Sequence, residues 1–448
     1  MTNHSSPEKS LVRGIRRWDL VAVTINGIIG AGIFGLPAKT FALIGNYSLI
    51  AFVACALIVC LIILCFAEVG SRFEETGGPY LYAREAFGET VAFEVGWLIW
   101  LARLTAFAAN CNLMISYLAF FWPPASGPVQ RAIIIVLVVL ALSLVNIVGI
   151  RQTTIASNVF TIGKLIPLLI FVAAGLFFLN RGAFVFGPAP STGAFSQSVL
   201  LLVYAFTGFE MAAIPAGEIR DPRRALPRAL LIAIGVVAVL YILIQVVSIG
   251  TLPGLASSGK PLADAGQRFL GTTGAAIISA GAIISIVGNL NIILLSGSRV
   301  PFAIAERGQL PRFLAQVHHR FATPHISILI SAAVMMFLTL KSSFVAALTI
   351  SAIARLVTYA ATCAALPVLR RRRDAPAAVF RVPGGTIIAI LSLILAAWLL
   401  ANNLMTDLRA GKSWWQIEAV QAAIAGMFGL LVYLAYRIVH NAQRAKES

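Results

Sequence analysis

Long apolar runs dominate this chain, and short polar stretches separate them. Twelve runs are long enough, at about 20 residues each, to cross the hydrocarbon core of a membrane as helices. The runs cover approximately residues 19–43, 47–71, 90–121, 130–149, 155–179, 197–218, 228–249, 273–299, 325–340, 344–367, 386–405 and 415–438. The pattern predicts an all-α membrane protein with about twelve transmembrane helices.

The first run contains many residues that disfavour a helix. Its stretch TINGIIGAGIFGLP, residues 24–37, holds Gly27, Gly30, Gly32, Gly35 and Pro37. Each glycine costs a helix interior up to about 1 kcal/mol relative to alanine. One interpretation is close packing of helices through small residues. The other is a helix broken near the middle of the membrane, because residues 30–32 lie about 17 to 20 Å into the run at 1.5 Å per residue.

A broken helix at that depth has a chemical consequence. Backbone groups without partners are tolerated inside a membrane only where they line a cavity or bind a ligand. The second half-helix begins with free N–H groups, and its dipole also favours an anion there. The break therefore predicts a binding site for a carboxylate.

A later run carries a corresponding break. In VYAFTGFEMAAIPAGEIRDPRRALPRAL, residues 203–230, Thr207 and Gly208 interrupt an apolar helix, and Glu210 follows directly. Paired broken helices in the two halves of a chain indicate the substrate site of a transporter, as in LeuT-type carriers. We therefore expect two inverted repeats of five helices each.

The predicted organisation has a tail at each end of a transporter core. The parts are a cytoplasmic N-terminal tail at 1–18, the core at 19–367 with repeats 19–179 and 197–367, accessory helices eleven and twelve at 368–440, and a cytoplasmic C-terminal tail at 441–448. Most of the 34 Lys and Arg residues lie in loops on the side of the two tails, which is the positive-inside pattern. No cleavable signal peptide is visible. We expect a multi-pass protein of the plasma (inner) membrane with both termini cytoplasmic, and basic loops that set topology rather than bind nucleic acid.

Composition narrows the class of function. Of the 448 residues 59% are hydrophobic and 11% are charged, whereas soluble domains carry about 25% charged residues. The sequence has no Walker A, HExxH or GxSxG motif and no long soluble segment. The five cysteines lie in apolar runs without metal-ligand spacing. We therefore expect no enzyme activity, no cofactor and no metal site, and a gradient must drive any transport.

Four ordered motifs resemble the amino acid–polyamine–organocation (APC) superfamily of permeases. They are INGIIGAGIFGLP (25–37), FAEVGSRFEETGGPYLYAREAFG (66–88), FTGFEMAAIPAGEIRDPRRALPRA (206–229) and LLSGSRVPFAIAERGQLPRF (294–313). The resemblance covers roughly residues 15–370. It implies the LeuT-like fold, with five-plus-five inverted repeats, broken helices 1 and 6, and two extra C-terminal helices. It also implies secondary transport of amino acids or related amines by alternating access.

The resemblance further implies that substrate binds between the two breaks. The N–H groups of Ala31, Gly32 and Ile33 would bind its carboxylate. Carbonyl groups near Ile28 and within 204–207 would accept hydrogen bonds from its amino group. An aromatic side chain would close over it, and either Tyr204 or Phe209 would fill that place. The full set of expected substrate contacts is Ile28, Gly30, Ala31, Gly32, Ile33, Arg103, Tyr204, Ala205, Thr207, Gly208 and Phe209.

Lys164 is a candidate for proton coupling. It lies about 14 Å into the fifth run at 1.5 Å per residue, where a charged side chain costs about 2.5–3.5 kcal/mol to insert. A structural interpretation is a lysine that pairs with a neighbour or reaches one membrane face. The functional interpretation is a titratable group, and the resemblance adds that a lysine here takes the place of a sodium ion in related carriers. Lys164 therefore favours proton coupling, or a permanent charge, over sodium.

Three further charged residues lie in or beside the runs. Glu210 follows the second break, so it either caps the next half-helix or acts in gating, through protonation or contact with the substrate amine. We expect Arg103 to face the cavity, where it either repels cationic substrates or is neutralised by Glu210. Arg355 lies near the repeat counterpart of Lys164, and we expect it to be a structural partner.

These observations predict a secondary active transporter of amino acids, with neutral substrates, alternating access and proton symport. Acidic substrates come next. An amino acid exchanger and a permease for amines, polyamines or another metabolite remain alternatives. A channel would need a continuous polar stripe and a sensor would need a soluble domain, and the sequence offers neither. The expected partners are the small-molecule substrate, protons and membrane lipid.

Overall fold

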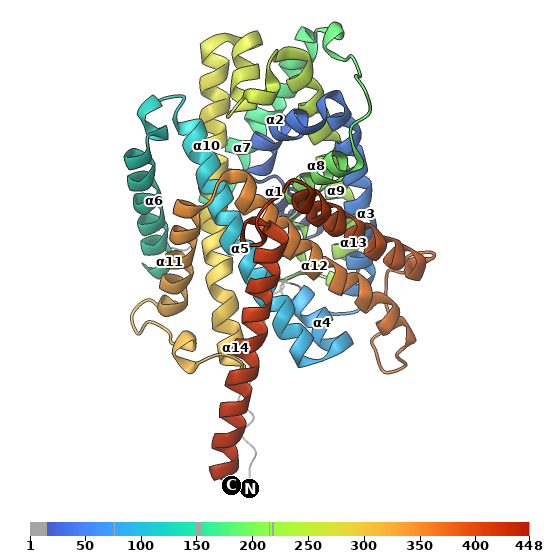
Figure 1. Cartoon of the computed structure of the whole chain (residues 1–448). Helices are drawn as coiled ribbons and strands as arrows, with labels where there is room; N and C mark the ends of the chain where they lie inside the picture. Colours follow the sequence, from blue (N-terminus) through green and yellow to red (C-terminus); the bar gives the residue numbers. More distant parts are fainter. Residues whose placement is uncertain (1–15, 76, 149–153, 215, 217–218, 448) are drawn as a thin grey trace.

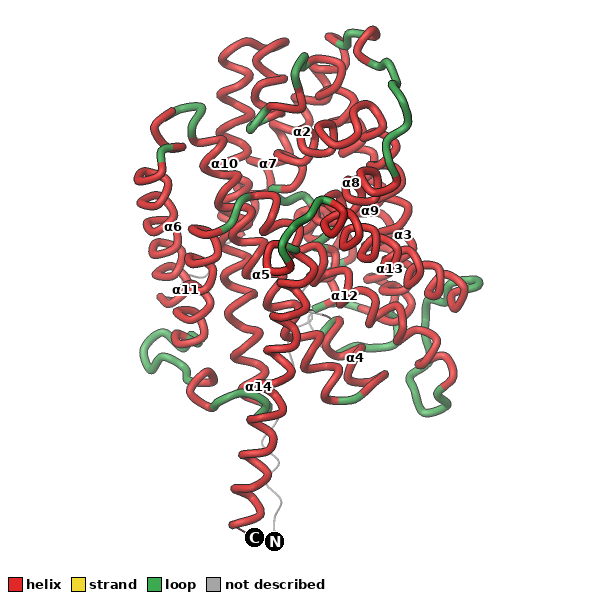
Figure 2. Tube along the Cα trace, viewed as in Figure 1, coloured by secondary structure: helices red, strands yellow, loops and turns green. Residues whose placement is uncertain are grey.

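The computed structural model of this chain describes residues 16–75, 77–148, 154–214, 216 and 219–447. Helices make up most of these residues, and short loops join them (Figure 2). Nine helical segments of the described residues are long and apolar enough to cross a membrane, and two shorter apolar helices accompany them. The prediction of an all-α, multi-pass membrane protein is confirmed at this level.

The helices of the first half follow the predicted runs. They are α1 (Arg17–Ile28), α2 (Gly32–Ile44), α3 (Ser48–Gly70), α4 (Pro79–Phe87), α5 (Glu89–Leu118), α6 (Pro128–Val148) and α7 (Thr154–Gly175). The first run contains two helices, α1 and α2, because the chain leaves the helical path at residues 29–31. The short amphipathic helix α4 lies between runs and was not expected from the apolar pattern.

The helices of the second half also follow the predicted runs. Its elements are α8 (Thr192–Ala205), the 3₁₀ helix η5 (Phe209–Ala213), α9 (Pro222–Thr251), α10 (Pro261–Glu306), α11 (His325–Lys341), α12 (Phe344–Arg371), α13 (Gly385–Arg409) and α14 (Glu418–Glu447). The run 197–218 again contains two helical pieces, α8 and η5. Helix α10 extends well before its predicted run, and it bends at Gly271, whose φ is 64°.

Helix α5 crosses the middle of the molecule and organises the packing around it. It packs most extensively against α10 and α12, and also against α4 and α11 (Figure 1). Helix α3 packs against α9, and α1 packs against α9 as well. Helix α14 lies against α5, where the Trp97 indole donates a hydrogen bond to the Ala425 carbonyl over 2.8 Å. The broken pairs α1–α2 and α8–η5 lie inside this arrangement.

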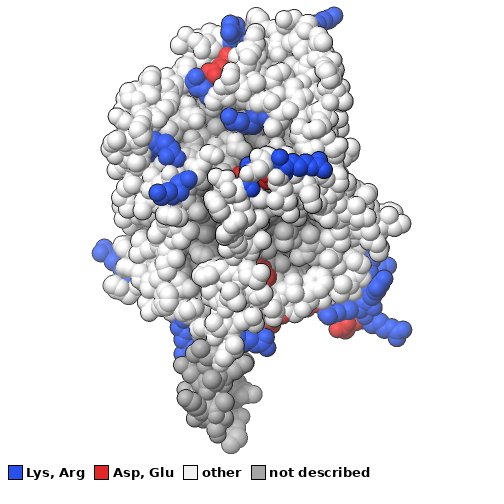
Figure 3. All heavy atoms as spheres, in the orientation of Figure 1, with Lys and Arg blue, Asp and Glu red and all other residues white. Residues whose placement is uncertain are grey.

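The outer surface suits a lipid environment. Helix α6 exposes large apolar side chains along one face, at Val129, Ile133, Leu137, Leu140 and Leu144. Figure 3 shows broad uncharged areas on the face in view, with Lys and Arg side chains in small groups, several of them at the lower edge. Apolar stripes of this extent are unfavourable in water and favourable against hydrocarbon.

Candidate functional site

The first break separates α1 from α2 and leaves helix ends inside the protein. Helix α1 ends at Ile28 and α2 begins at Gly32. No side chain caps the N-terminus of α2, whose N-cap residue is Ala31. The first N–H groups of a helix have no acceptor within the helix, so the start of α2 presents donors to whatever lies beside it.

The second break separates α8 from η5 and depends on one glycine. Helix α8 ends at Ala205, and Gly208 has φ 110° and ψ −16°. This backbone conformation is strained for any residue with a Cβ atom. A Cβ atom at Gly208 would also collide with the carbonyl oxygen of Gly27. The two breaks therefore touch through backbone atoms.

Other close approaches join the same two segments. A Cβ atom on Gly32 would lie 2.9 Å from the Cα atom of Ala205. The hydroxyl group of Tyr241, on α9, lies 3.1 Å from the Ile28 carbonyl oxygen and 3.2 Å from the Ala205 carbonyl oxygen. A single phenol proton can serve either acceptor. Tyr241 thus bridges the ends of α1 and α8.

Replacing Tyr241 with phenylalanine is expected to destabilise the protein by about 0.5–1.5 kcal/mol, the contribution of one buried hydrogen bond. Thermal unfolding in detergent checks this. Tyr47→Phe is the matched control, since the Tyr47 hydroxyl donates to the Gly187 carbonyl at 3.2 Å in an exposed position. Equal stabilities of the two variants would contradict a role for the Tyr241 bridge.

A cavity of about 200 Å³ lies between the two breaks. It is smaller than the roughly 300–1,000 Å³ of sites for drug-sized ligands, so it suits a small molecule. Of the residues predicted from the sequence, the cavity is lined by Ile28, Gly30, Ala31, Gly32, Arg103, Lys164, Tyr204, Ala205, Thr207 and Gly208. Ile33, Phe209 and Glu210 are not in its lining.

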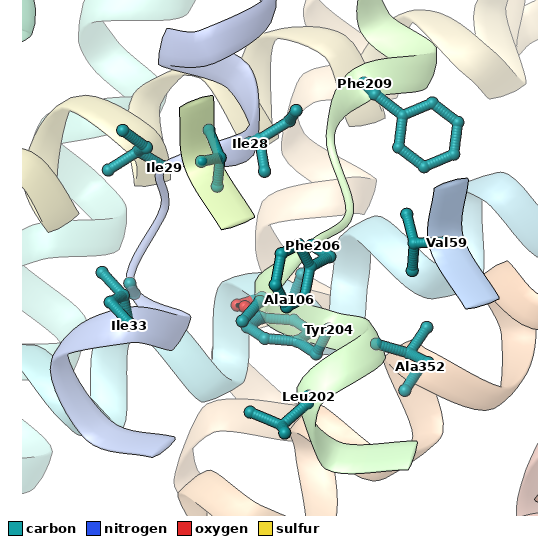
Figure 4. Packing of buried hydrophobic residues seen from close by; sticks show 14 of the residues in the cluster. Ile28, Ile29, Ile33, Val59, Ala106, Leu202, Tyr204, Phe206, Phe209 and Ala352 are labelled. Carbon is teal, nitrogen blue, oxygen red and sulfur yellow. Dashed lines mark hydrogen bonds between the residues drawn. The ribbon is translucent and has the colours of Figure 1, made fainter. Parts of the chain in front are cut away.

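The two aromatic candidates occupy different places. Tyr204 lines the cavity, and its hydroxyl group donates a hydrogen bond to Asn110 Oδ1 over 2.5 Å. Phe209 is fully buried and packs its ring against Phe66 and Tyr359, with centroid distances of 5.2 Å and 5.0 Å. Figure 4 shows Tyr204 on the last turn of α8, and the Phe209 ring beyond the second break, directed away from Ile29. Of the two, only Tyr204 is positioned to contact a molecule in the cavity.

Lys164 joins α7 to the first break. Its ammonium group donates to the Asn26 carbonyl at 2.6 Å and to the Ile29 carbonyl at 2.8 Å, and the side chain is 6% exposed. These carbonyls belong to the last turn of α1 and the residue after it, where the helix dipole is negative. A positive charge is therefore stabilised at this point, and it holds the end of α1 in place.

Glu210 lies at the centre of a buried ionic cluster next to the cavity. Its Oε1 atom forms an ion pair with Arg355 of α12 and lies 4.0 Å from the Arg103 guanidinium of α5. Its Oε2 atom accepts hydrogen bonds from the Tyr359 hydroxyl at 2.7 Å and the Gly208 N–H at 2.8 Å. One carboxylate therefore links the second break to two helices of the surrounding bundle.

The structure adds residues that the sequence did not mark as site residues. Arg355 lines the cavity and pairs with Glu210, and its burial in an apolar run was the signal for a partner. Asn289 of α10 also lines the cavity, and a Cβ atom on Gly30 would lie 2.9 Å from its amide nitrogen. Neither Asn289 nor Tyr241 stands in a motif that would single it out.

The match to known proteins identifies the class of this site. A family model described as amino acid permease matches residues 15–428. This chain belongs to the amino acid permease family. The resemblance to APC permeases is thereby confirmed, and this permease transports amino acids across a membrane and is not an enzyme.

Curated relatives align with this permease over nearly their whole length. The serine/threonine exchanger SteT of Bacillus subtilis (strain 168) is 29% identical over 426 residues, covering 92% of this chain and 94% of the relative. The branched-chain amino acid permease BcaP of the same organism is 26% identical over 98% of this chain and 96% of the relative. The methylthioribose transporter of Bacillus subtilis (strain 168) is 28% identical over 97% of this chain and 96% of the relative.

Proposed function

We propose that this permease is a secondary active transporter of neutral amino acids that works by alternating access and is coupled to protons. The observation that carries the proposal is the cavity between the two breaks, whose lining includes residues from the ends of α1 and α8 and the start of α2. The helix ends supply backbone N–H donors and carbonyl acceptors within the membrane. An amino acid has a carboxylate for the donors and an amino group for the acceptors.

The proposed pose places the substrate carboxylate at the start of α2. There the N–H groups of Ala31 and Gly32, which line the cavity, and of Ile33, the next residue, lie at the start of a helix whose dipole attracts an anion. The substrate amino group would lie toward the end of α8, where carbonyl groups of 204–207 can accept from it. Tyr204 would lie against the substrate side chain, because it lines the cavity between the breaks.

Charge in the cavity supports neutral substrates. The described lining includes three cations, Arg103, Lys164 and Arg355, and the adjacent Glu210 pairs with both arginines. A cationic side chain would be repelled, whereas a neutral amino acid brings no net charge. The relatives named for serine, threonine and branched-chain amino acids fit this class. Acidic amino acids are the second candidate, because the cations outnumber the one carboxylate.

The proposed architecture is the LeuT-like arrangement of twelve spans. In it the repeats 19–179 and 197–367 form the core, 368–440 adds two accessory helices, and the tails 1–18 and 441–448 lie in the cytoplasm. The broken pairs α1–α2 and α8–η5 support this assignment, since they fall at matching places in the two repeats. The basic loops support the cytoplasmic position of both tails in the plasma membrane.

Lys164 is the proposed coupling residue, and uptake into proteoliposomes tests it. We expect an inward proton gradient to raise uptake of labelled neutral amino acids several-fold in the wild type. Lys164→Ala should lose this stimulation, because it removes the cation held by the Asn26 and Ile29 carbonyls. Lys164→Arg separates two roles, since arginine keeps the charge but does not release its proton.

The same uptake assay includes a control variant and the results that would contradict the proposal. Lys341→Ala removes an exposed lysine at the end of α11 and should retain the gradient response. Gradient response in Lys164→Arg would make Lys164 a fixed charge. Uptake that ignores the gradient and requires internal amino acid would make the protein an exchanger, as the relative SteT is named. No amino acid uptake by the wild type would overturn the proposed function.

A further inference from the structure

A basic hollow lies at the surface, away from the substrate cavity. Its volume is about 390 Å³. Its lining comes from the start of α1 and the start of α9, namely Arg16, Arg17, Arg220, Asp221, Arg224, Ala225 and Arg228. Asp221 is the only acidic side chain among the described residues that line it. Among the described lining residues other than Arg220, four arginines therefore line one space together with one carboxylate.

Asp221 neutralises little of the charge of Arg224. Asp221 lies 3.8 Å from Arg224, and the two side chains are 60% and 69% exposed. Exposed ion pairs of this length contribute little to stability. Arginine presents two parallel N–H donors that match the oxygens of a phosphate group. The hollow therefore has the chemistry of a site for a phosphate-bearing anion.

The surroundings of the hollow distinguish a lipid from a soluble anion. On α9 the exposed positions Arg224 and Arg228 are followed at the same helical spacing by Ile232 and Val236, which are 38% and 49% exposed. Residues four apart lie on one face of a helix. The basic face of α9 thus continues directly into an apolar outer face, as expected where a helix enters the hydrocarbon region.

An interfacial aromatic residue lies beside the hollow. Trp18 on α1 is 64% exposed, and the Arg17 guanidinium lies 5.6 Å from the centre of its ring. Tryptophan is enriched at the level of lipid headgroups, where its ring lies among carbonyl groups and its N–H faces water. Trp18 therefore places the basic side chains at the start of α1 at the level of the lipid headgroups.

We propose that this hollow binds the headgroup of an anionic phospholipid. The phosphate contacts the arginines from both helices, and the acyl chains lie along the apolar face of α9. Because α1 ends at the first break and packs against α9, whose Tyr241 contacts both breaks, a bound lipid ties together two helices beside the substrate cavity.

Quenching of Trp18 fluorescence by brominated lipids tests the proposal on the full-length protein. Vesicles contain brominated phosphatidylglycerol or brominated phosphatidylcholine, and the Trp18 signal is the difference between wild type and Trp18→Phe. We expect stronger quenching by the anionic lipid. The variant Arg17→Gln/Arg224→Gln/Arg228→Gln should lose this preference by at least about tenfold, since each arginine near an anionic surface contributes about a fivefold preference.

A charge-matched control separates a local site from overall charge. Arg312→Gln/Arg371→Gln/Arg373→Gln removes three exposed arginines elsewhere and should keep the preference. If the first triple variant does not fold, Arg228→Gln alone should still weaken the preference about fivefold. Equal loss in both triple variants would overturn the site. Full reversal of the quenching by millimolar inorganic phosphate would assign the hollow to a soluble anion instead.

Discussion

Replacing Glu210 with glutamine is expected to abolish uptake and to destabilise the protein by about 3–5 kcal/mol, the usual cost of removing one partner of a buried ion pair. Glu210 is 4% exposed, and its carboxylate lies against the guanidinium groups of Arg355 and Arg103. Without the negative charge, two cations remain in a region of low dielectric constant. Thermal unfolding in detergent and uptake into proteoliposomes measure the two effects.

A second variant separates stability from transport. In Glu210→Gln/Arg355→Met both members of the closest pair are neutral, so much of the lost stability should return, as it does when buried ion pairs are replaced as a unit. Uptake should stay absent, because the Gly208 N–H loses its charged acceptor at the second break. Tyr359→Phe is the mild control, since it removes one neutral donor to Glu210. Wild-type stability in Glu210→Gln would contradict the ionic cluster.

The breaks could be predicted from the sequence because their signal is local. Glycines concentrated within an apolar run are unfavourable for a helix, so Gly30, Gly32 and Gly208 point to non-helical backbone without knowledge of the fold. The structure has α1 end at Ile28, two residues before Gly30, and α8 end at Ala205, three residues before Gly208, whereas Gly32 is the first residue of α2. The contact between the two breaks, in contrast, depends on segments far apart in the chain.

The partners of the buried charges could not be assigned from the sequence. A charged residue in an apolar run requires a partner, but the sequence does not say which one. Arg103 was considered as the partner of Glu210, whereas the structure brings Arg355 closer, although the two are 145 residues apart. The Tyr241 bridge had no signal at all, because a tyrosine in an apolar run is ordinary.

The position of Phe209 shows that a place next to the break in the sequence does not put a side chain in the cavity. Phe209 directly follows Gly208, so the sequence favoured Phe209 and Tyr204 equally as the aromatic residue that closes over the substrate. The left-handed backbone at Gly208 turns the chain, and the Phe209 ring then packs against Phe66 and Tyr359. Which aromatic faces the cavity thus depends on a backbone angle that the sequence does not encode locally.

Replacing Gly208 with alanine is expected to abolish uptake and to lower the thermal stability markedly. A residue with a Cβ atom at φ 110° costs about 1–3 kcal/mol through backbone strain alone. The added methyl group would also collide with the Gly27 carbonyl, which is backbone and cannot rotate away. Relief of that contact requires the second break to move from the first, which would open the wall of the cavity.

Gly235→Ala is the matched control for this substitution. Gly235 lies on the exposed face of α9, and a Cβ atom there would meet no atom within 4 Å. Uptake should be unchanged, and stability should rise by up to about 1 kcal/mol because alanine favours a helix. Uptake at the wild-type level in Gly208→Ala would show that the breaks can separate without harm. Loss of uptake in Gly208→Ala alone would instead mean that the backbone contact between the breaks is needed for transport, since the same chemical change is harmless where space is open.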